Sequence, residues 1–120
     1  MAGQNLKGFA RIWAALFNSV AGFKATWHHE EAFRQEVLLF VVGVPLGLWL
    51  GDGAVEQSLL IGVLFIVLIV ELLNTAVEVT VDRIGFERHE LSARAKDIGS
   101  AAVLSSLVLA GAVWLLVLLR

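Results

Sequence analysis

A run of 22 residues without a charge, at 98–119, is the feature that most constrains this chain. As an α-helix rising about 1.5 Å per residue, it can span a hydrocarbon core of about 30 Å. Two shorter uncharged runs, 37–51 and 57–70, precede it. Neither is long enough alone, so one helix must extend back toward Glu30 and the other forward past Glu71. The sequence therefore predicts an all-α integral membrane protein with crossings at about 30–50, 55–82 and 92–119.

Composition supports this fold class. Hydrophobic residues make up 58% of the 120 residues, above the usual share for a soluble domain. A soluble bundle of three buried helices would need polar outer faces, and these segments have none. The net charge of −2 and the lack of a basic stripe argue against a nucleic-acid partner. With no cysteine, disulfides and thiolate metal sites are excluded. We expect one membrane domain over 1–120.

Lysine and arginine are distributed unevenly around the three crossings. Four precede the uncharged run 37–51, none lies between it and the run 57–70, four lie between that run and 98–119, and one follows. By the positive-inside rule, the N-terminus and the second connection face the cytoplasm and the C-terminus lies outside. The predicted location is the plasma (inner) membrane, as a multi-pass protein.

Residues 4–27 predict a different kind of helix. Their apolar side chains recur at helical spacing, while Lys7, Arg11 and Asn18 share the opposite side. This pattern is typical of an amphipathic helix that lies in the membrane interface. On the pattern alone, a simple anchor is the favoured interpretation.

Polar side chains form a stripe inside the second crossing. Glu71, Asn74, Glu78 and Asp82 are spaced 3, 4 and 4 residues apart. They therefore lie within an arc of about 80° on one helix face, with Thr75 beside them. One ionised carboxylate in a bilayer costs at least about 2.5 kcal/mol. Hydrogen bonding between helices is the alternative role, but carboxylates that repel one another suit it poorly, so a functional site is favoured.

Cations follow this stripe along the chain. Carboxylates facing cations at the membrane surface suggest a site for Mg²⁺ and a polyphosphate. The three histidines are not at zinc-ligand spacing, and no soluble nucleotide-binding motif is present. From the residues alone, phosphoryl transfer, a proton relay and cation conduction remain open. The candidate counter-charges are Arg83, Arg88, Arg94 and Lys96.

The second half of the chain carries four short motifs: Glu-Leu-Leu-Asn-Thr-Ala-Val-Glu (71–78), Asp-Arg-Ile-Gly (82–85), His-Glu-Leu-Ser (89–92) and Ala-Lys-Asp-Ile-Gly-Ser (95–100). With Gly-Phe-x-Arg (8–11) and Glu-x-Ala-Phe-Arg-Gln-Glu (30–36), they resemble the small prokaryotic diacylglycerol kinases over nearly the whole chain. The resemblance implies a homotrimer of three-helix subunits, each with a surface helix. It also implies transfer of the γ-phosphoryl group of MgATP to the hydroxyl of diacylglycerol.

The resemblance further implies roles for single residues. Glu71 matches the catalytic base, and Glu30 and Glu78 match the carboxylates that hold the Mg²⁺ of the nucleotide. Positions around ATP are occupied by Arg11, Asn18, Glu30, Glu78, Glu87, His89, Lys96 and Asp97. Positions in the lipid-substrate pocket are matched by Ser19, Lys24, Trp27, Ala32, Arg34, Gln35, Trp49, Glu71, Asn74 and Ser100. Taken alone, Glu30, Glu31 and Glu36 are read as solvating a helix start.

Three positions depart from the family pattern. Asn18 stands where a tyrosine is common, which removes a ring that could stack on the nucleotide. Lys24 stands where arginine is usual, and Arg88 adds a cation to the loop between the second and third crossings. None of these departures changes a carboxylate of the predicted site.

Alternative functions make distinct demands on the sequence. Undecaprenol kinase has the same core motifs but phosphorylates a polyprenol. Residues 82–85 and 89–92 look more like the diacylglycerol branch of the family. A proton or cation pathway needs a polar lining through the whole membrane, whereas 59–70 is entirely apolar or glycine. A purely structural assembly subunit predicts that neutralising Glu71 and Glu78 together stabilises the fold without loss of activity.

Overall fold

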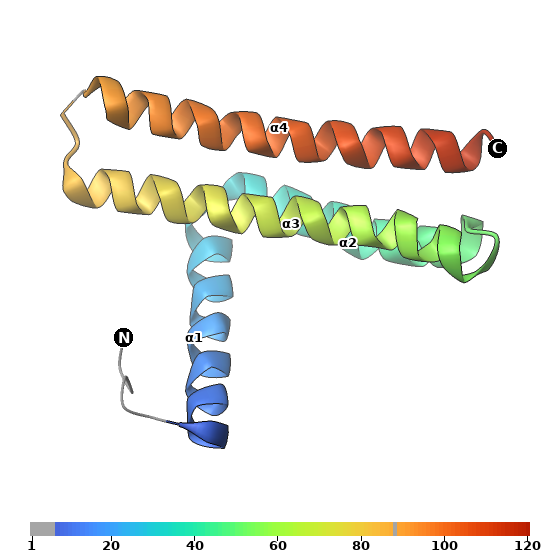
Figure 1. Ribbon diagram of the computed structural model, residues 1–120, viewed down its shortest axis with the longest axis horizontal. Helices are drawn as coiled ribbons and strands as arrows, with labels where there is room; N and C mark the ends of the chain where they lie inside the picture. Colours follow the sequence, from blue (N-terminus) through green and yellow to red (C-terminus); the bar gives the residue numbers. More distant parts are fainter. Residues whose placement is uncertain (1–6, 88) are drawn as a thin grey trace. The chain divides into compact units, whose positions relative to one another are not determined.

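The computed structural model describes residues 7–87 and 89–120, which form four α-helices and no strand (Figure 1). Residues 4–6 of the predicted surface helix and the predicted counter-charge Arg88 lie outside this description. The chain divides into two compact units, the second of which spans Ala32–Arg120. The first contains α1, and the second contains nearly all of α2 together with α3 and α4. The predicted all-α fold is confirmed.

Helix α1 spans Gly8–His29 and exposes an apolar face. Phe9, Trp13 and Phe17 follow one another at intervals of four residues and are all exposed. The Trp13 and Phe17 rings meet edge to face at a centroid distance of 5.6 Å. Large exposed aromatic groups on one side of a helix suit the boundary between lipid headgroups and acyl chains.

The other three helices are each long and apolar enough to cross a membrane. Helix α2 spans Glu31–Leu50, α3 spans Gly53–Ile84 and α4 spans Glu90–Leu118. At 32 residues, α3 is about 48 Å long and exceeds a hydrocarbon core of about 30 Å. Its two ends can therefore carry charged groups while its middle stays in the membrane. The fold is that of a multi-pass membrane protein.

Helices α3 and α4 run antiparallel, side by side (Figure 1). Small residues on α4 permit this close approach, and Val63, Val67 and Ala110 form a buried cluster between the helices. Trp114 packs against that cluster and donates its indole N–H to the carbonyl oxygen of Leu60, at 3.0 Å. A partly buried indole benefits from such a partner, because an unpaired N–H in an apolar setting would be costly.

Helix α2 packs on α3 through glycine. A β-carbon at Gly43 would lie only 2.5 Å from Cδ1 of Leu64, and one at Gly47 would lie 3.3 Å from Cβ of Leu60. The side chains of α3 thus fill the space that larger residues on α2 would occupy. This is the close approach that the Gly43, Gly47 and Gly51 spacing favours.

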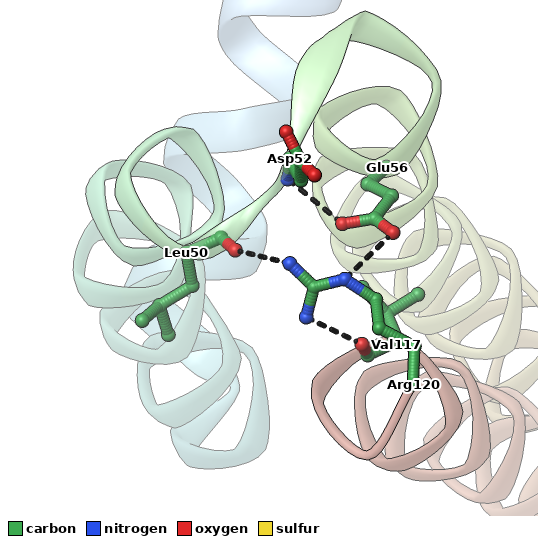
Figure 2. A network of polar contacts seen from close by, with 5 residues as sticks. All are labelled: Leu50, Asp52, Glu56, Val117 and Arg120. Carbon is green, nitrogen blue, oxygen red and sulfur yellow. Dashed lines mark hydrogen bonds and ion pairs between the residues drawn. The ribbon is translucent and has the colours of Figure 1, made fainter.

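A polar network joins the helix ends at the α2–α3 turn (Figure 2). Arg120 Nε lies 2.8 Å from Glu56 Oε2, and Arg120 Nη1 donates to the carbonyl oxygen of Val117 at 2.7 Å. Arg120 Nη2 also donates to the carbonyl oxygen of Leu50, at 3.4 Å. Glu56 Oε1 accepts the backbone N–H of Asp52 at 2.7 Å. One guanidinium therefore connects groups from the ends of α2, α3 and α4.

We expect Glu56→Gln to lower the free energy of unfolding by less than about 1 kcal/mol, because both partners are partly exposed to water. Glutamine keeps an oxygen that can accept from Asp52, so the change removes mainly the charge. Thermal unfolding in detergent checks this, with the exposed Glu31→Gln as the matched control. A loss of several kcal/mol would show that the pair is shielded from water.

Candidate active site

The buried face of α3 changes from apolar to polar at Glu71. Upstream, Leu60, Val63, Leu64 and Val67 are buried. The same face continues with Glu71, only 4% exposed, and then with Thr75, which is also buried. The predicted stripe therefore begins where this run of buried apolar side chains on α3 ends.

Glu71 meets a second carboxyl group from α2. The Glu36 side chain lies in hydrogen-bond contact with that of Glu71, and its Oε2 atom is buried. A hydrogen bond between two carboxyl groups needs a proton on one of them. From the sequence, Glu36 has no predicted role beyond the helix start. The available signal was its place directly before the uncharged run 37–51.

Farther along α3, the stripe faces α4. Asn74 Nδ2 donates to Glu78 Oε1 at 3.2 Å. Lys96 Nζ donates to Asp82 Oδ1 at 2.7 Å, and both side chains are about two-fifths exposed. The stripe thus divides between two neighbours: its most buried carboxylate contacts α2, and Asn74 and Asp82 contact α4. Glu78 is held by Asn74 on its own helix.

Among the predicted counter-charges that the structure describes, Lys96 is the one that contacts the stripe through an ion pair. Arg94 instead lies 3.9 Å from Glu90, one turn away on its own helix, and both side chains are largely exposed. Arg83 is exposed at the end of α3. Arg94 is a predicted counter-charge of the stripe, but the ion pair that it makes is with Glu90 on its own helix. Its position on α4 turns its side chain away from α3.

Four predicted ATP-binding residues lie before or near the start of α4, and their side chains have different surroundings. His89 is the N-cap, and its Nδ1 accepts the backbone N–H of Leu91 at 3.0 Å. This contact fixes the ring orientation and requires Nδ1 to be unprotonated. Lys96 faces α3, whereas the next residue, Asp97, is exposed and lines an open hollow of about 530 Å³ with Glu90 and Arg94. Glu87 is exposed in the turn before the helix.

Besides Glu71 and Asn74 on α3, the predicted lipid-pocket residues of the second unit lie at both ends of α2 and on α4. Arg34 is half-buried and Gln35 exposed, near Glu36 in the first turns of α2. Trp49 is 78% exposed and follows Glu36 by 13 residues, about 20 Å along the helix. The remaining two are exposed: Ala32 in the first turn of α2, and Ser100 on α4 beside Gly99.

The predicted site residues of the first unit lie on or just after α1. Ser19 Oγ donates to the carbonyl oxygen of Ala15 at 2.9 Å, a bond within the helix. Glu30 is the C-cap, and its N–H donates to the carbonyl oxygen of Thr26 at 2.9 Å. The remaining members, all exposed, are Arg11, Asn18, Lys24 and Trp27.

An apolar groove of about 430 Å³ runs between α3 and α4 beside the stripe. Val70, Leu73 and Ile98 contribute to its lining, and Asn74 adds a polar group. A groove with apolar walls and one polar edge suits a molecule that is itself mostly apolar.

The stripe offers hard oxygen donors of the kind that Mg²⁺ prefers. Within residues 7–87 and 89–120, no group of three acidic, histidine or cysteine side chains is placed to enclose a metal ion. Mg²⁺ commonly takes one or two protein carboxylates and fills its remaining positions with phosphate oxygens and water. The donor set therefore fits an ion that arrives with a nucleotide.

Together these features define an integral membrane protein with a buried acidic site beside an apolar groove. A family model described as "Prokaryotic diacylglycerol kinase" matches residues 17–118, and the chain belongs to this family. The diacylglycerol kinase of Escherichia coli strain K12 is 47% identical over 114 residues, which cover 95% of this chain and 93% of that protein.

Two further relatives have a similar sequence identity to this chain. The diacylglycerol kinase of Pseudomonas aeruginosa PAO1 is 48% identical over 112 residues, covering 93% of this chain and 91% of that protein. The diacylglycerol kinase of Haemophilus influenzae Rd is 49% identical over 96 residues, covering 80% of this chain and 81% of that protein.

Proposed function

We propose that this chain is an ATP-dependent diacylglycerol kinase that makes phosphatidic acid at the cytoplasmic surface of the inner membrane. The observation that carries the proposal is the buried Glu71, placed where the apolar face of α3 becomes polar. A lipid hydroxyl can reach that level from the membrane, and the charged phosphates of a nucleotide can approach from the polar end. The chain's membership of the family supports the same reaction.

In the proposed reaction, the lipid hydroxyl oxygen attacks the γ-phosphorus of ATP. Its proton passes to the carboxylate of Glu71, the bond from the γ-phosphorus to the bridging oxygen breaks, and ADP leaves. Mg²⁺, when bound, would neutralise part of the charge on the phosphates. Glu78 and Glu30 are proposed to hold this ion, and Lys96 to face the phosphates as a point charge.

Glu36 gives the proposed base a partner. Because the two carboxyl groups share a hydrogen bond, Glu36 can carry the proton while Glu71 is ionised and ready to accept another. Two ionised carboxylates in contact would repel each other strongly in this buried setting. Glu36 is thus proposed to keep Glu71 available as a base.

A lipid acceptor fits the groove beside Asn74. Apolar side chains of α3 and α4 can contact an acyl chain, while the polar edge lies on the side of the stripe. Diacylglycerol and undecaprenol both have long apolar chains and one hydroxyl, so the groove suits either. Family membership favours diacylglycerol.

A phosphorylation assay tests the proposal. The purified protein would receive radiolabelled ATP, Mg²⁺ and either dioleoylglycerol or undecaprenol in mixed micelles. Label in phosphatidic acid is expected, and faster labelling of undecaprenol would change the acceptor. If neither lipid is labelled and liposomes carrying the protein conduct protons or cations, the pathway alternative replaces the kinase.

The assembly and the orientation also belong to the proposal. Exposed apolar side chains cover much of α2 and α4, which suits contact with lipid or with further copies of the chain. We infer a homotrimer with a cytoplasmic N-terminus and an external C-terminus. Cross-linking in membranes would give the number of copies, and labelling of single introduced cysteines at each terminus would give the orientation.

We expect Lys96→Gln to raise the KM for MgATP about 10- to 100-fold, because one charge-assisted contact with phosphate is worth about 1.5–3 kcal/mol. The unfolding temperature should change little, since the pair with Asp82 is partly exposed. Steady-state kinetics and thermal unfolding check both parts. Arg94→Gln removes a cation from the same helix and is the matched control, with an unchanged KM expected. Equal effects of the two variants would contradict a specific role for Lys96.

A further inference from the structure

Helix α4 approaches the stripe very closely at Gly99. A β-carbon at this position would collide with Oδ1 of Asn74 and would lie 3.2 Å from its Cγ. The Asn74 carboxamide therefore occupies the space that a side chain at position 99 would take. Glycine alone leaves this space open, because every other residue type carries a β-carbon.

The two ends of the Asn74 amide meet different neighbours. Its Nδ2 donates to Glu78 Oε1 at 3.2 Å. Its Oδ1 is buried and, in the described part of the chain, has no conventional hydrogen-bond partner. That oxygen instead faces the backbone of Gly99, where a Cα–H group can make the weak contact common at close helix packings. Turning the amide around would place its oxygen against the Glu78 carboxylate, and two acceptors repel.

We propose that Gly99 is a positioning residue, which lets Asn74 reach against α4 and hold the Glu78 carboxylate in the orientation that binds the divalent cation of the nucleotide. Gly99 touches neither the cation nor the lipid in this arrangement and acts through Asn74. The inference rests on the proposed function, because it assigns Glu78 to the cation.

A positioning role and a packing role predict different effects of a methyl group at position 99. The atom that would be displaced is the end of the flexible Asn74 side chain, so the amide can rotate without separation of the helices. Alanine also favours a helix more than glycine does. Gly99→Ala should therefore retain the fold and lose the hydrogen bond to Glu78.

Gly111 offers a matched control on the same helix. A β-carbon at Gly111 would have no atom within 4 Å, so Gly111→Ala adds the same methyl group without displacing a side chain. Both variants gain the same helix preference. Any difference between them reports the contact at Asn74.

The experiment uses the full chain in detergent micelles and three measurements. The side-chain amide resonance of Asn74 is followed by ¹⁵N NMR without nucleotide, Mn²⁺ affinity is measured by EPR with a non-hydrolysable ATP analogue, and thermal unfolding is recorded. We expect Gly99→Ala to shift the Asn74 resonance and to weaken Mn²⁺ binding about 10-fold, as is typical when a second-shell partner is lost. Its unfolding temperature should not fall, and Gly111→Ala should change neither the resonance nor the affinity.

A double-variant cycle tests whether Gly99 acts through Asn74. In an Asn74→Ala background, Gly99→Ala should cause no further loss of Mn²⁺ affinity. The proposal would be overturned by additive losses in this cycle. It would also be overturned by an unchanged Asn74 resonance, an unchanged Mn²⁺ affinity or a lowered unfolding temperature in Gly99→Ala, or if the wild type failed to bind Mn²⁺ with the analogue. Failure of the kinase proposal is seen separately, as an absence of lipid phosphorylation by the wild type.

Discussion

Glu71→Gln is expected to lower kcat for lipid phosphorylation by about 10²–10⁴-fold, the usual contribution of a positioned general base. Glutamine has nearly the same shape but cannot accept the hydroxyl proton. The neighbouring Glu36 should not replace it, because its own carboxyl group would then hydrogen-bond to the new amide. Membrane insertion and MgATP binding should persist. Single-turnover phosphate transfer, with nucleotide binding measured alongside, checks this result.

The control for this substitution is Glu90→Gln, which neutralises a carboxylate whose side chain is 89% exposed. We expect its turnover to match the wild type. Normal turnover in Glu71→Gln would exclude Glu71 as the base. Loss of MgATP binding together with turnover would instead assign Glu71 to the nucleotide site.

Glu78→Gln is expected to change a different parameter, the Mg²⁺ concentration needed for half-maximal activity. Loss of a carboxylate ligand should raise it at least about 10-fold, since even second-shell changes commonly have that effect. At saturating Mg²⁺, kcat should recover in part, because Glu71 remains in place. Titration of Mg²⁺ at fixed ATP measures this shift.

Glu56→Gln is the matched control for Glu78→Gln. It neutralises a carboxylate at the opposite end of the same helix, outside the proposed site. Its Mg²⁺ dependence should equal that of the wild type. A Glu78→Gln enzyme with unchanged Mg²⁺ dependence would show that Glu78 does not hold the ion. The pair of substitutions at Glu71 and Glu78 thus separates the chemical step from metal binding.

Several features of this protein follow from local sequence. The three crossings are predictable because a helix must be long and apolar to cross a membrane, and 98–119 meets both requirements within one segment. The stripe is predictable because 3.6 residues per turn place Glu71, Asn74 and Glu78 on one helix face. These properties depend on length and period, and no neighbouring helix is needed to define them.

Other features depend on which helices pack together. Helical period assigns Glu71 to a face, but only the packing of α2 on α3 brings Glu36 to it. Lys96 and Arg94 are two residues apart and chemically similar, yet only Lys96 contacts the stripe, because such a separation rotates a side chain about 200° around the axis.

Gly99 shows most clearly the difference between what local sequence predicts and what helix packing decides. As one small residue among several on α4, it predicts close packing and no particular neighbour. The tertiary structure places the Asn74 amide in the space above it, and this position determines the hydrogen bond to Glu78. Periodicity along a chain reports the direction of a side chain about its own helix axis. The distance to a partner on another helix is decided by how the helices pack, through contacts between residues far apart in sequence.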